Sequence, residues 1–215
     1  MHWEDEGYIL AKNNFNENSI IIETFTSNHG KYSGIVYGGA SRKQKKDLQI
    51  GNKILINWKS KNQNSPGYFV IELIDPIAPF FFDDKKRSIC LMAATSILKI
   101  LLPERQVNPK IYASFEEILN NLKKENWIYS YIYWELSLIK DLGFEIDLLD
   151  KKVLQINNRE IKIPNLILNA AISENNNKNT LEALIFNKNL IIENFITPNK
   201  LRFPLFRSIL EKYYT

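Results

Sequence analysis

The stretch SIIIETFTSNHGKYSGIVYGG, residues 19–39, carries the pattern that predicts the fold of this chain. The β-branched run at residues 19–26 is typical of a strand. The SNHG segment that follows predicts a tight turn, where His29 beside Gly30 tolerates unusual backbone angles. Residues 31–39 predict the next strand, and its glycines suit bulges or sharp bending. Two consecutive strands joined by a tight turn therefore indicate an all-β region.

Three further segments around this pair also predict strands. Residues 53–61 alternate apolar and polar side chains, as a half-buried strand does. Residues 7–12 and 68–74 are short apolar runs of the same kind, and prolines close the block at residues 76–79. Five short strands without a long helix predict a five-stranded OB-fold β-barrel, the oligonucleotide-binding type. An SH3-like barrel is the alternative.

Beyond the fifth predicted strand the pattern changes to helices. Asp83 or Asp84 can cap an apolar helical pattern that runs to Leu102. Ser114 and Glu117 form the S-x-x-E spacing of a capping box, which predicts that a helix of residues 114–125 begins there.

A long helix is predicted at residues 127–143, ending at a glycine, and its many apolar and aromatic residues favour the centre of a bundle. Residues 143–164 return to short extended pieces, read as a small hairpin, and the last fifty residues are helical again. The predicted fold class is therefore α+β and multidomain. Residues 1–78 form the OB-fold nucleic-acid-binding domain, and residues 79–215 form an α-helical domain with a short extended insertion at about 143–164.

Composition and charge limit the possible functions. The 215 residues are 45% hydrophobic, which is enough for a folded core. The formal net charge is +4, and residues 1–78 hold nine Lys and Arg against eight Asp and Glu, so an anion site must come from local clustering. The single cysteine, Cys90, excludes an internal disulfide and a thiolate metal cage, and its apolar surroundings predict a buried thiol.

Neither a secretory signal nor a membrane span is expected. The first ten residues are acidic and mixed, and no apolar stretch reaches the roughly 20 residues that a spanning helix needs. We therefore expect a cytoplasmic protein without membrane partners.

The strongest chemical signal is a basic loop after the third predicted strand. Arg42, Lys43, Lys45 and Lys46 place four cations within five residues, next to a pair of glycines. On a flexible connection at the rim of an OB-type barrel, such cations would follow the phosphates of a nucleic acid. The alternative is a solvated loop in a lysine-rich chain.

Other residues give weaker signals for nucleic-acid binding. Aromatic side chains of the strands could stack on bases, although alternation places most of them in the core. They are Tyr8, Phe25, Tyr32, Tyr37, Trp58, Tyr68 and Phe69. Two further cation clusters could hold a second strand, although each is more simply a solvated helix end. They are Lys85, Lys86 and Arg87, and Lys200, Arg202 and Arg207.

Catalytic motifs are missing from the sequence. It contains no phosphate loop, dinucleotide fingerprint, nucleophile elbow or H-E-x-x-H pair, and its two histidines are His2 and His29, the latter explained by a turn. We therefore expect no enzyme, no catalytic residue and no cofactor.

The order of these segments resembles the RecO family of recombination mediator proteins. The resemblance is specific in WEDEGYIL (residues 3–10), in SIIIETFTSNHGKYSGIVYGGASR (19–42), in LQIGN (48–52) and in WELSLIKDLGFEIDL (134–148). It extends loosely over the rest of the chain, and the alphaproteobacterial-type members are the most similar.

The resemblance implies an N-terminal OB-fold barrel followed by a helical domain, and a protein that is not an enzyme. Members of the family bind single- and double-stranded DNA and anneal complementary strands. They act with RecR to load RecA onto DNA coated by single-strand-binding protein (SSB), whose C-terminal tail docks on the helical domain. The basic barrel surface of the family corresponds here to Lys31, Arg42, Lys43, Lys45 and Lys46.

One departure from the family concerns zinc. Many members carry a four-cysteine zinc site after the segment that corresponds to residues 143–148, whereas this chain has no cysteine there. Zinc requires thiolate or imidazole ligands at short spacing, so we expect no metal and a short hairpin in its place.

Two alternative functions stay open at this point. One is an adaptor that bridges RecR and SSB, in which DNA contact is incidental. The other is an OB-fold factor that binds RNA.

Overall fold

The structure is a computed structural model, and it describes residues 1–61, 67–144, 152–156, 159–169 and 176–215. The chain divides into two compact units, Met1–Tyr112 and Ala113–Thr215. In the described ranges, none of the helices combines the length and the apolar character that crossing a bilayer requires.

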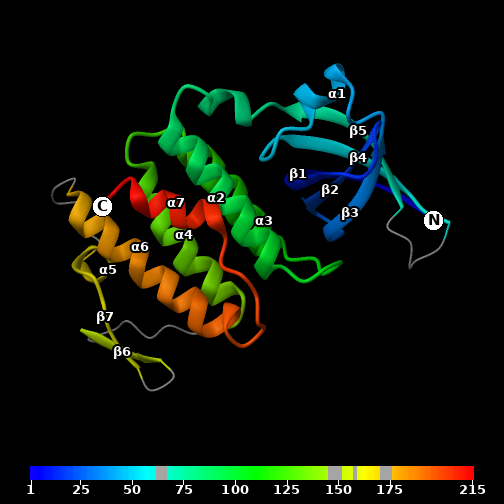
Figure 1. Cartoon of the computed structure of the whole chain (residues 1–215). Coiled ribbons are helices and arrows are strands. Elements are labelled where there is room, and N and C mark those ends of the chain that lie inside the picture. Colours follow the sequence, from blue (N-terminus) through cyan, green and yellow to red (C-terminus); the bar gives the residue numbers. More distant parts are fainter. Residues whose placement is uncertain (62–66, 145–151, 157–158, 170–175) are drawn as a thin grey trace. The chain divides into compact units, whose positions relative to one another are not determined.

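The first unit contains the predicted barrel (Figure 1). Its strands lie in the ring order β1-β2-β3-β5-β4, and a parallel pair between Ile35 of β3 and Tyr68 of β5 closes the ring. The strands are β1 (His2–Asn14), β2 (Ser19–Thr26), β3 (Gly30–Tyr37), β4 (Lys53–Lys59) and β5 (Tyr68–Asp75). The predicted OB-type barrel followed by helices is confirmed.

Strand β1 is longer than the sequence pattern indicates, because it pairs with two neighbours. Its first half pairs with β4, from His2 opposite Lys59 to Tyr8 opposite Lys53. Its second half pairs with β2, and the register shifts between Ile9 and Ala11. A bulge in a strand shared by two partners allows the sheet to curve into a barrel. The interior is filled by apolar side chains from all five strands, among them Ile9, Ile22, Val36, Ile56 and Phe69.

Helix α2 (Lys85–Leu101) belongs to the same unit and packs on β1. Asp84 caps it by accepting a hydrogen bond from the Arg87 amide at 3.0 Å, and Leu102 follows its last residue, as predicted. Near its other end, Lys99 forms a 2.8 Å ion pair with Glu23 of β2. Cys90 is buried within the helix. A short 3₁₀ turn, η1 (Ala78–Phe81), connects β5 to α2.

The boundary between the two compact units lies further along the sequence than the predicted domain boundary. The change from strands to helices follows β5, near the predicted residue 78, but the first unit continues through α2 to Tyr112. Whether residues 1–78 fold by themselves stays a prediction.

The start predicted for the helix of residues 114–125 is wrong. Helix α3 (Pro109–Asn121) begins five residues before Ser114, so the proposed capping box lies inside it. The side chain of Asn108 accepts a hydrogen bond from the Ile111 amide at 3.2 Å, and Pro109 occupies the first helical position. This combination of an asparagine cap and a leading proline is itself a common helix start.

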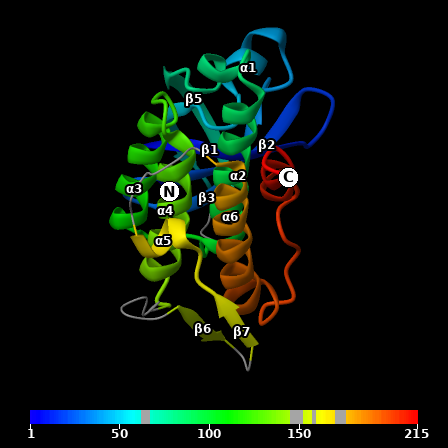
Figure 2. The ribbon, with the colours of Figure 1, turned by 90° about the vertical axis from the view of Figure 1, so that its left-hand side faces the viewer.

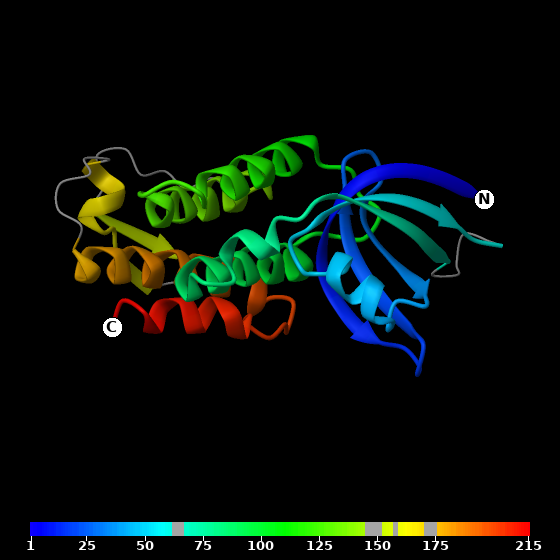
Figure 3. The same ribbon diagram turned by 90° about the horizontal axis from the view of Figure 1, so that it is seen from above.

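The second unit is built around α4 (Trp127–Asp141), which packs against α6 (Asn177–Ile191). Most α4 side chains are buried, as predicted for a central helix, and Gly143 follows it with a positive φ of 97°. Figure 3 shows α6 and α7 (Leu205–Lys212) side by side. Between α6 and α7 the chain forms a short π-helix, η2 (Ile192–Ile196).

The segment predicted as an insertion is described only in part. Strands β6 (Val153–Ile156) and β7 (Arg159–Lys162) pair antiparallel where the sequence predicts a small hairpin (Figure 2). A short helix, α5 (Asn165–Asn169), follows them. Residues 145–151 and 157–158 of the predicted insertion lie outside the described residues.

Candidate nucleic-acid interface

The predicted basic loop is a short helix, α1 (Arg42–Asp47), between β3 and β4. The Ser41 hydroxyl accepts a hydrogen bond from the Gln44 amide at 3.4 Å and caps it. The turn before it depends on two glycines. Gly38 has a φ of +71°, which side chains other than glycine rarely adopt, and a Cβ on Gly39 would lie 2.7 Å from Ile20. The segment expected to be a loop is therefore a short capped helix.

Three contacts hold the end of α1 on the barrel. The Leu48 side chain is fully buried in the barrel core. The Asn52 amide donates to the Asp47 carbonyl at 3.0 Å, and the Lys12 ammonium donates to the Leu48 carbonyl at 2.7 Å. Figure 3 shows α1 lying beside the barrel strands. The basic side chains thus start from a backbone that the core fixes in place.

All four cations of α1 are exposed. Arg42, Lys45 and Lys46 share one face of the helix by their i, i+3 and i+4 spacing. Within the described part of the chain none of these four side chains takes part in a salt bridge. Like charges at this spacing destabilise a helix. Arg42 and Lys43 in the first turn also oppose the helix dipole, whereas Lys45 and Lys46 in the last turn favour it. An anion bound from outside would relieve the repulsion between the cations.

A cavity of about 440 Å³ opens beside α1 and adds a fifth cation to this surface. Lys12 and Lys45 both line it, together with amide side chains and an apolar base. Its lining residues are Lys12, Asn13, Asn14, Ile20, Gly39, Lys45, Leu48 and Gln49. Burial, and then the charge of Lys45, lower the pKa of the Lys12 ammonium. The cavity therefore has a positive wall and no acidic residue in its lining.

Sequence reasoning did not find Lys12. It is a lone lysine at the end of a predicted strand, and its role depends on the contact with the Leu48 carbonyl, 36 residues further along the chain. No local pattern signals such a contact.

Lys31 does not join this surface as an accessible cation. Its side chain is only 8% exposed, and its ammonium donates to the Lys99 carbonyl of α2 at 2.8 Å. Burial lowers its pKa, an effect that Glu104 and Glu23 oppose and Lys99 reinforces. The structure therefore brings together Arg42, Lys43, Lys45 and Lys46 and leaves Lys31 as a contact between the barrel and α2.

Of the two other cation clusters, the first is a solvated helix end, as the simpler sequence expectation has it, since Lys85 and Lys86 are exposed. Lys85, Lys86 and Arg87 form the first turn of α2, where the Arg87 guanidinium pairs with Asp84. In the other cluster, Lys200 and Arg202 are exposed.

Arg207 is fully buried, so its proposed contact with DNA is wrong. Its guanidinium donates to both oxygens of Glu135, at 2.5 and 3.0 Å, and to Glu211 at 2.8 Å. Burial alone would lower the pKa of Arg207, but the charges of Glu135, Tyr131 and Glu211 and the hydrogen bond to Glu135 together outweigh it and raise the pKa. The buried acids on α4 and α7 explain its position in the core.

The structure shows which strand aromatics face outward. Tyr8, Phe25, Trp58 and Phe69 are buried, and Tyr32 is half-buried. Tyr37 and Tyr68 are exposed, and their ring centroids are 6.0 Å apart. His29 lies in the turn before β3, as predicted, but the unusual backbone angle there, a φ of 74°, belongs to Gly30. The His29 Nδ1 lies 2.8 Å from the Asp5 carboxylate, and its ring stacks on Trp3.

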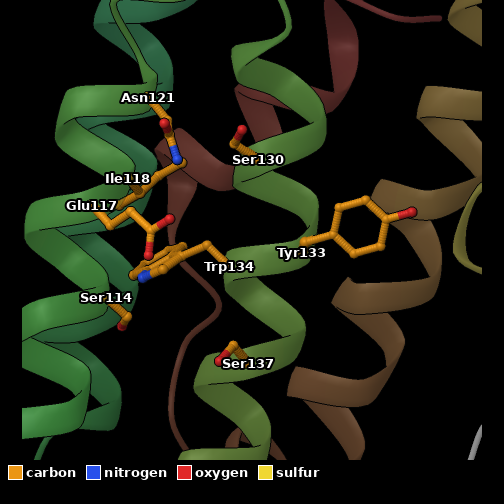
Figure 4. A pocket seen from close by; sticks show the side chains of 8 residues that line it. All are labelled: Ser114, Glu117, Ile118, Asn121, Ser130, Tyr133, Trp134 and Ser137. Carbon is orange, nitrogen blue, oxygen red and sulfur yellow. The ribbon is translucent and has the colours of Figure 1, made fainter. Parts of the chain in front are cut away.

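A second cavity, of about 330 Å³, lies between α3 and α4 in the second unit (Figure 4). Its lining residues are Ser114, Glu117, Ile118, Asn121, Ser130, Tyr133, Trp134 and Ser137. Glu117 is the one charged residue of this lining, so the cavity offers no cation to an acidic peptide or a phosphate. Tyr133 points away from α3, and its hydroxyl donates to the Leu166 carbonyl at 2.7 Å.

The residues present do not fit the four-cysteine zinc site that the sequence resemblance brought into question. The chain has one cysteine, which is buried within α2, and two histidines, which both belong to the barrel unit. One thiol and two imidazoles, far apart in the sequence, cannot supply the four closely spaced ligands of such a zinc site.

Comparison with known families matches both parts of the chain. Residues 1–77 match the family model described as "Recombination protein O N terminal". Residues 83–155 match "Recombination protein O C terminal".

Individual relatives agree with these matches. The chain is 34% identical over 148 residues to the DNA repair protein RecO of Jannaschia sp. (strain CCS1), covering 69% of this chain and 61% of that protein. It is 34% identical over 149 residues to the protein of the same name from Roseobacter denitrificans, covering 69% and 62%. The match to the protein from Rhodospirillum rubrum is 30% identical over 154 residues, covering 69% and 61%. The chain therefore spans about three fifths of the length of these relatives.

Among solved structures, asparaginyl-tRNA synthetase from Entamoeba histolytica aligns with 72% of this chain and 35% of that chain. The TM-score is 0.28 and the sequence identity 16%.

Proposed function

The chain belongs to the RecO family of DNA repair proteins, and from this premise we propose that it binds single- and double-stranded DNA through α1 and the adjoining barrel surface. The observation that carries the proposal is the group of four exposed cations on α1, which have no acidic partner in the described part of the chain. Because α1 is held by the barrel core, these cations form a surface with a defined shape.

The proposed mechanism is strand annealing by charge neutralisation. Two DNA strands repel each other, and a cationic surface that binds both backbones lowers the free energy of their approach. Phosphate contacts carry no sequence information, so binding should show little sequence preference. The protein would act by binding, without chemical catalysis or a cofactor, in the cytoplasm where the DNA lies.

Membership of the family supports a proposal for the partners. We propose that the chain acts with RecR to load RecA onto SSB-coated DNA, and that the helical domain receives the C-terminal tail of SSB. The cavity between α3 and α4 is not the proposed tail site, because Glu117 would repel an acidic tail.

The first prediction concerns the cations of α1. Replacing Arg42, Lys43, Lys45 and Lys46 by alanine should weaken binding of a single-stranded oligonucleotide. The slope of log K against log salt should become shallower by about 0.7 for each cation that contacts a phosphate. Fluorescence anisotropy at several salt concentrations measures both quantities, and annealing of SSB-coated complementary strands should slow in parallel.

The control removes the same charge elsewhere. Its four exposed lysines are Lys110, Lys140, Lys178 and Lys212. Alanine at these positions lowers the net charge equally but leaves α1 intact, so the salt slope should stay close to that of the unchanged protein. Equal affinity and slope in the α1 variant and the unchanged protein would overturn the proposal.

Two experiments separate the alternatives. An adaptor would retain SSB-tail binding and the loading activity in the α1 variant, because DNA contact would be incidental to it. An RNA-binding factor would prefer RNA over DNA of equal length, because the 2′-hydroxyl gives it a group to recognise.

A further inference from the structure

Tyr37 and Tyr68 form an exposed aromatic pair on the outside of the barrel. The two side chains are 65% and 38% exposed, although tyrosine rings on strands are commonly covered. Among the aromatic contacts of the described residues, this is the pair in which both rings are exposed. The planes meet at 53°, so the rings do not cover each other's faces.

The positions of the two tyrosines are fixed by the seam that closes the barrel. Tyr68 pairs with Ile35 of β3 in the parallel contact, and Tyr37 is the last residue of β3. The adjacent residues in the sequence, Val36 and Phe69, point inward and are buried. Alternation along both strands therefore keeps the tyrosines on the outer face.

Cations adjoin this pair, one in the sheet and the others next along the chain. Lys59 of β4 is the antiparallel partner of Tyr68, so their side chains share one face of the sheet, and Lys59 is exposed. Along the chain, the Ser41 amide donates to the Gly38 carbonyl at 3.0 Å in the turn that joins Tyr37 to α1. This tight turn is the short connection from Tyr37 to α1, which begins at Arg42.

We propose that Tyr37 and Tyr68 are a stacking platform for the bases of single-stranded DNA, an inference that rests on the proposed DNA-binding function. A single strand presents flat apolar bases and anionic phosphates in alternation, which matches exposed rings with adjoining cations. An apolar protein partner is a poorer match, because it would bury Lys59 and the α1 cations without supplying an acidic group to pair with them. A duplex keeps its bases stacked inside, so it can use the cations but not the rings.

The second prediction tests this platform with the full chain. Tyr37→Ala combined with Tyr68→Ala should lower the affinity for a mixed-sequence single strand about tenfold or more. Affinity for a duplex should change by less than about twofold, since its bases are already stacked. The salt slope should be unchanged, because no phosphate contact is lost.

Matched variants separate stacking from other effects. Tyr37→Phe with Tyr68→Phe keeps the rings and should bind like the unchanged protein. Phe82→Ala removes a ring of similar exposure, 62%, from the connection to α2 and should also leave binding unchanged. Thermal unfolding of each variant verifies that the barrel is intact.

An abasic oligonucleotide gives an independent readout. It keeps the phosphates but removes the bases, so the unchanged protein should bind it more weakly, and the alanine variant should show no further loss. The platform is overturned if the alanine variant binds the normal single strand as well as the unchanged protein does. In that case a loss of salt slope in the α1 variant would still support DNA binding, so the two proposals fail separately.

Discussion

Asp5 is the residue that orders the turn between β2 and β3. Its buried carboxylate accepts hydrogen bonds from the Ser27 hydroxyl at 2.6 Å and from the Asn28 amide at 2.8 Å, and it contacts His29. Burial by itself would raise the pKa of Asp5, but the hydrogen bonds from Ser27, His29 and Asn28 together lower it to about 2. A strand residue thus holds a turn more than twenty residues away in sequence.

The third prediction concerns the pH dependence of stability at Asp5. Because its pKa is about 2 in the folded state and 3.8 ordinarily, its contribution is present above about pH 4 and is lost as pH falls toward 2. Asp5→Asn should therefore lower the free energy of unfolding by about 2 kcal/mol at pH 7. The difference between the two proteins should shrink between pH 4 and pH 2, as urea unfolding at each pH can measure.

Glu4→Gln is the matched control for Asp5, because it neutralises an exposed carboxylate at the preceding position of β1. It should change the unfolding free energy by less than about 0.5 kcal/mol. A stability difference for Asp5→Asn that stays constant from pH 7 to pH 2 would contradict the assignment.

At the scale of elements, α1 links barrel packing to the proposed DNA contact. The helix has no buried residue of its own, so its position depends on Leu48 directly after it. Leu48 packs with the inward residues of the strands, and its carbonyl receives the Lys12 ammonium. A helix of six residues has little stability alone, so this anchor determines where the cations lie.

The fourth prediction follows from that anchor. Leu48→Ala should lower the unfolding free energy by about 2–5 kcal/mol, because it leaves a cavity in the barrel core. Below the unfolding transition, hydrogen exchange at the amides of α1 should accelerate more than exchange in β2 or β3. Val107→Ala, which truncates an exposed side chain of the same unit, should alter neither measurement. Unchanged exchange in α1 of Leu48→Ala would show that another contact positions the helix.

At the scale of the whole molecule, the barrel unit includes more than its strands. Lys99 of α2 pairs with Glu23, the Lys31 ammonium donates to the Lys99 carbonyl, and Leu91 packs against Gly51. The segment that follows α2 continues this contact, since the Arg105 amide donates to the Lys31 carbonyl at 2.8 Å. These contacts explain why the compact unit extends to Tyr112.

The fifth prediction compares two fragments that test the domain boundary. A fragment of residues 1–112 keeps the contacts of α2 and should unfold in one cooperative transition. A fragment of residues 1–78 exposes the apolar surface that α2 covers and leaves Lys31 without its acceptor, so it should be several kcal/mol less stable. Equal stability of the two fragments in urea would favour the boundary that the sequence predicts.

The sequence by itself determined the elements whose signals are local. β-branched and apolar runs, with alternation at residues 53–61, placed β2 to β5 within one or two residues. An aspartate cap and an apolar pattern that ends at Leu102 placed both ends of α2. It also located the cluster Arg42–Lys46, because crowded charges are visible in any window of the sequence. The start of α3 was missed where two local signals competed and Asn108 with Pro109 prevailed over Ser114.

Only the tertiary structure decided which charged and aromatic side chains face solvent. Lys31 and Arg207 are cations in sequence, but Lys99 and Glu135 lie 68 and 72 residues away and hold them inside. Tyr37 and Tyr68 look like the other strand aromatics, and the seam of the barrel turns them outward. Such outcomes depend on contacts between distant segments, which form only when the ring of strands closes and the helices pack.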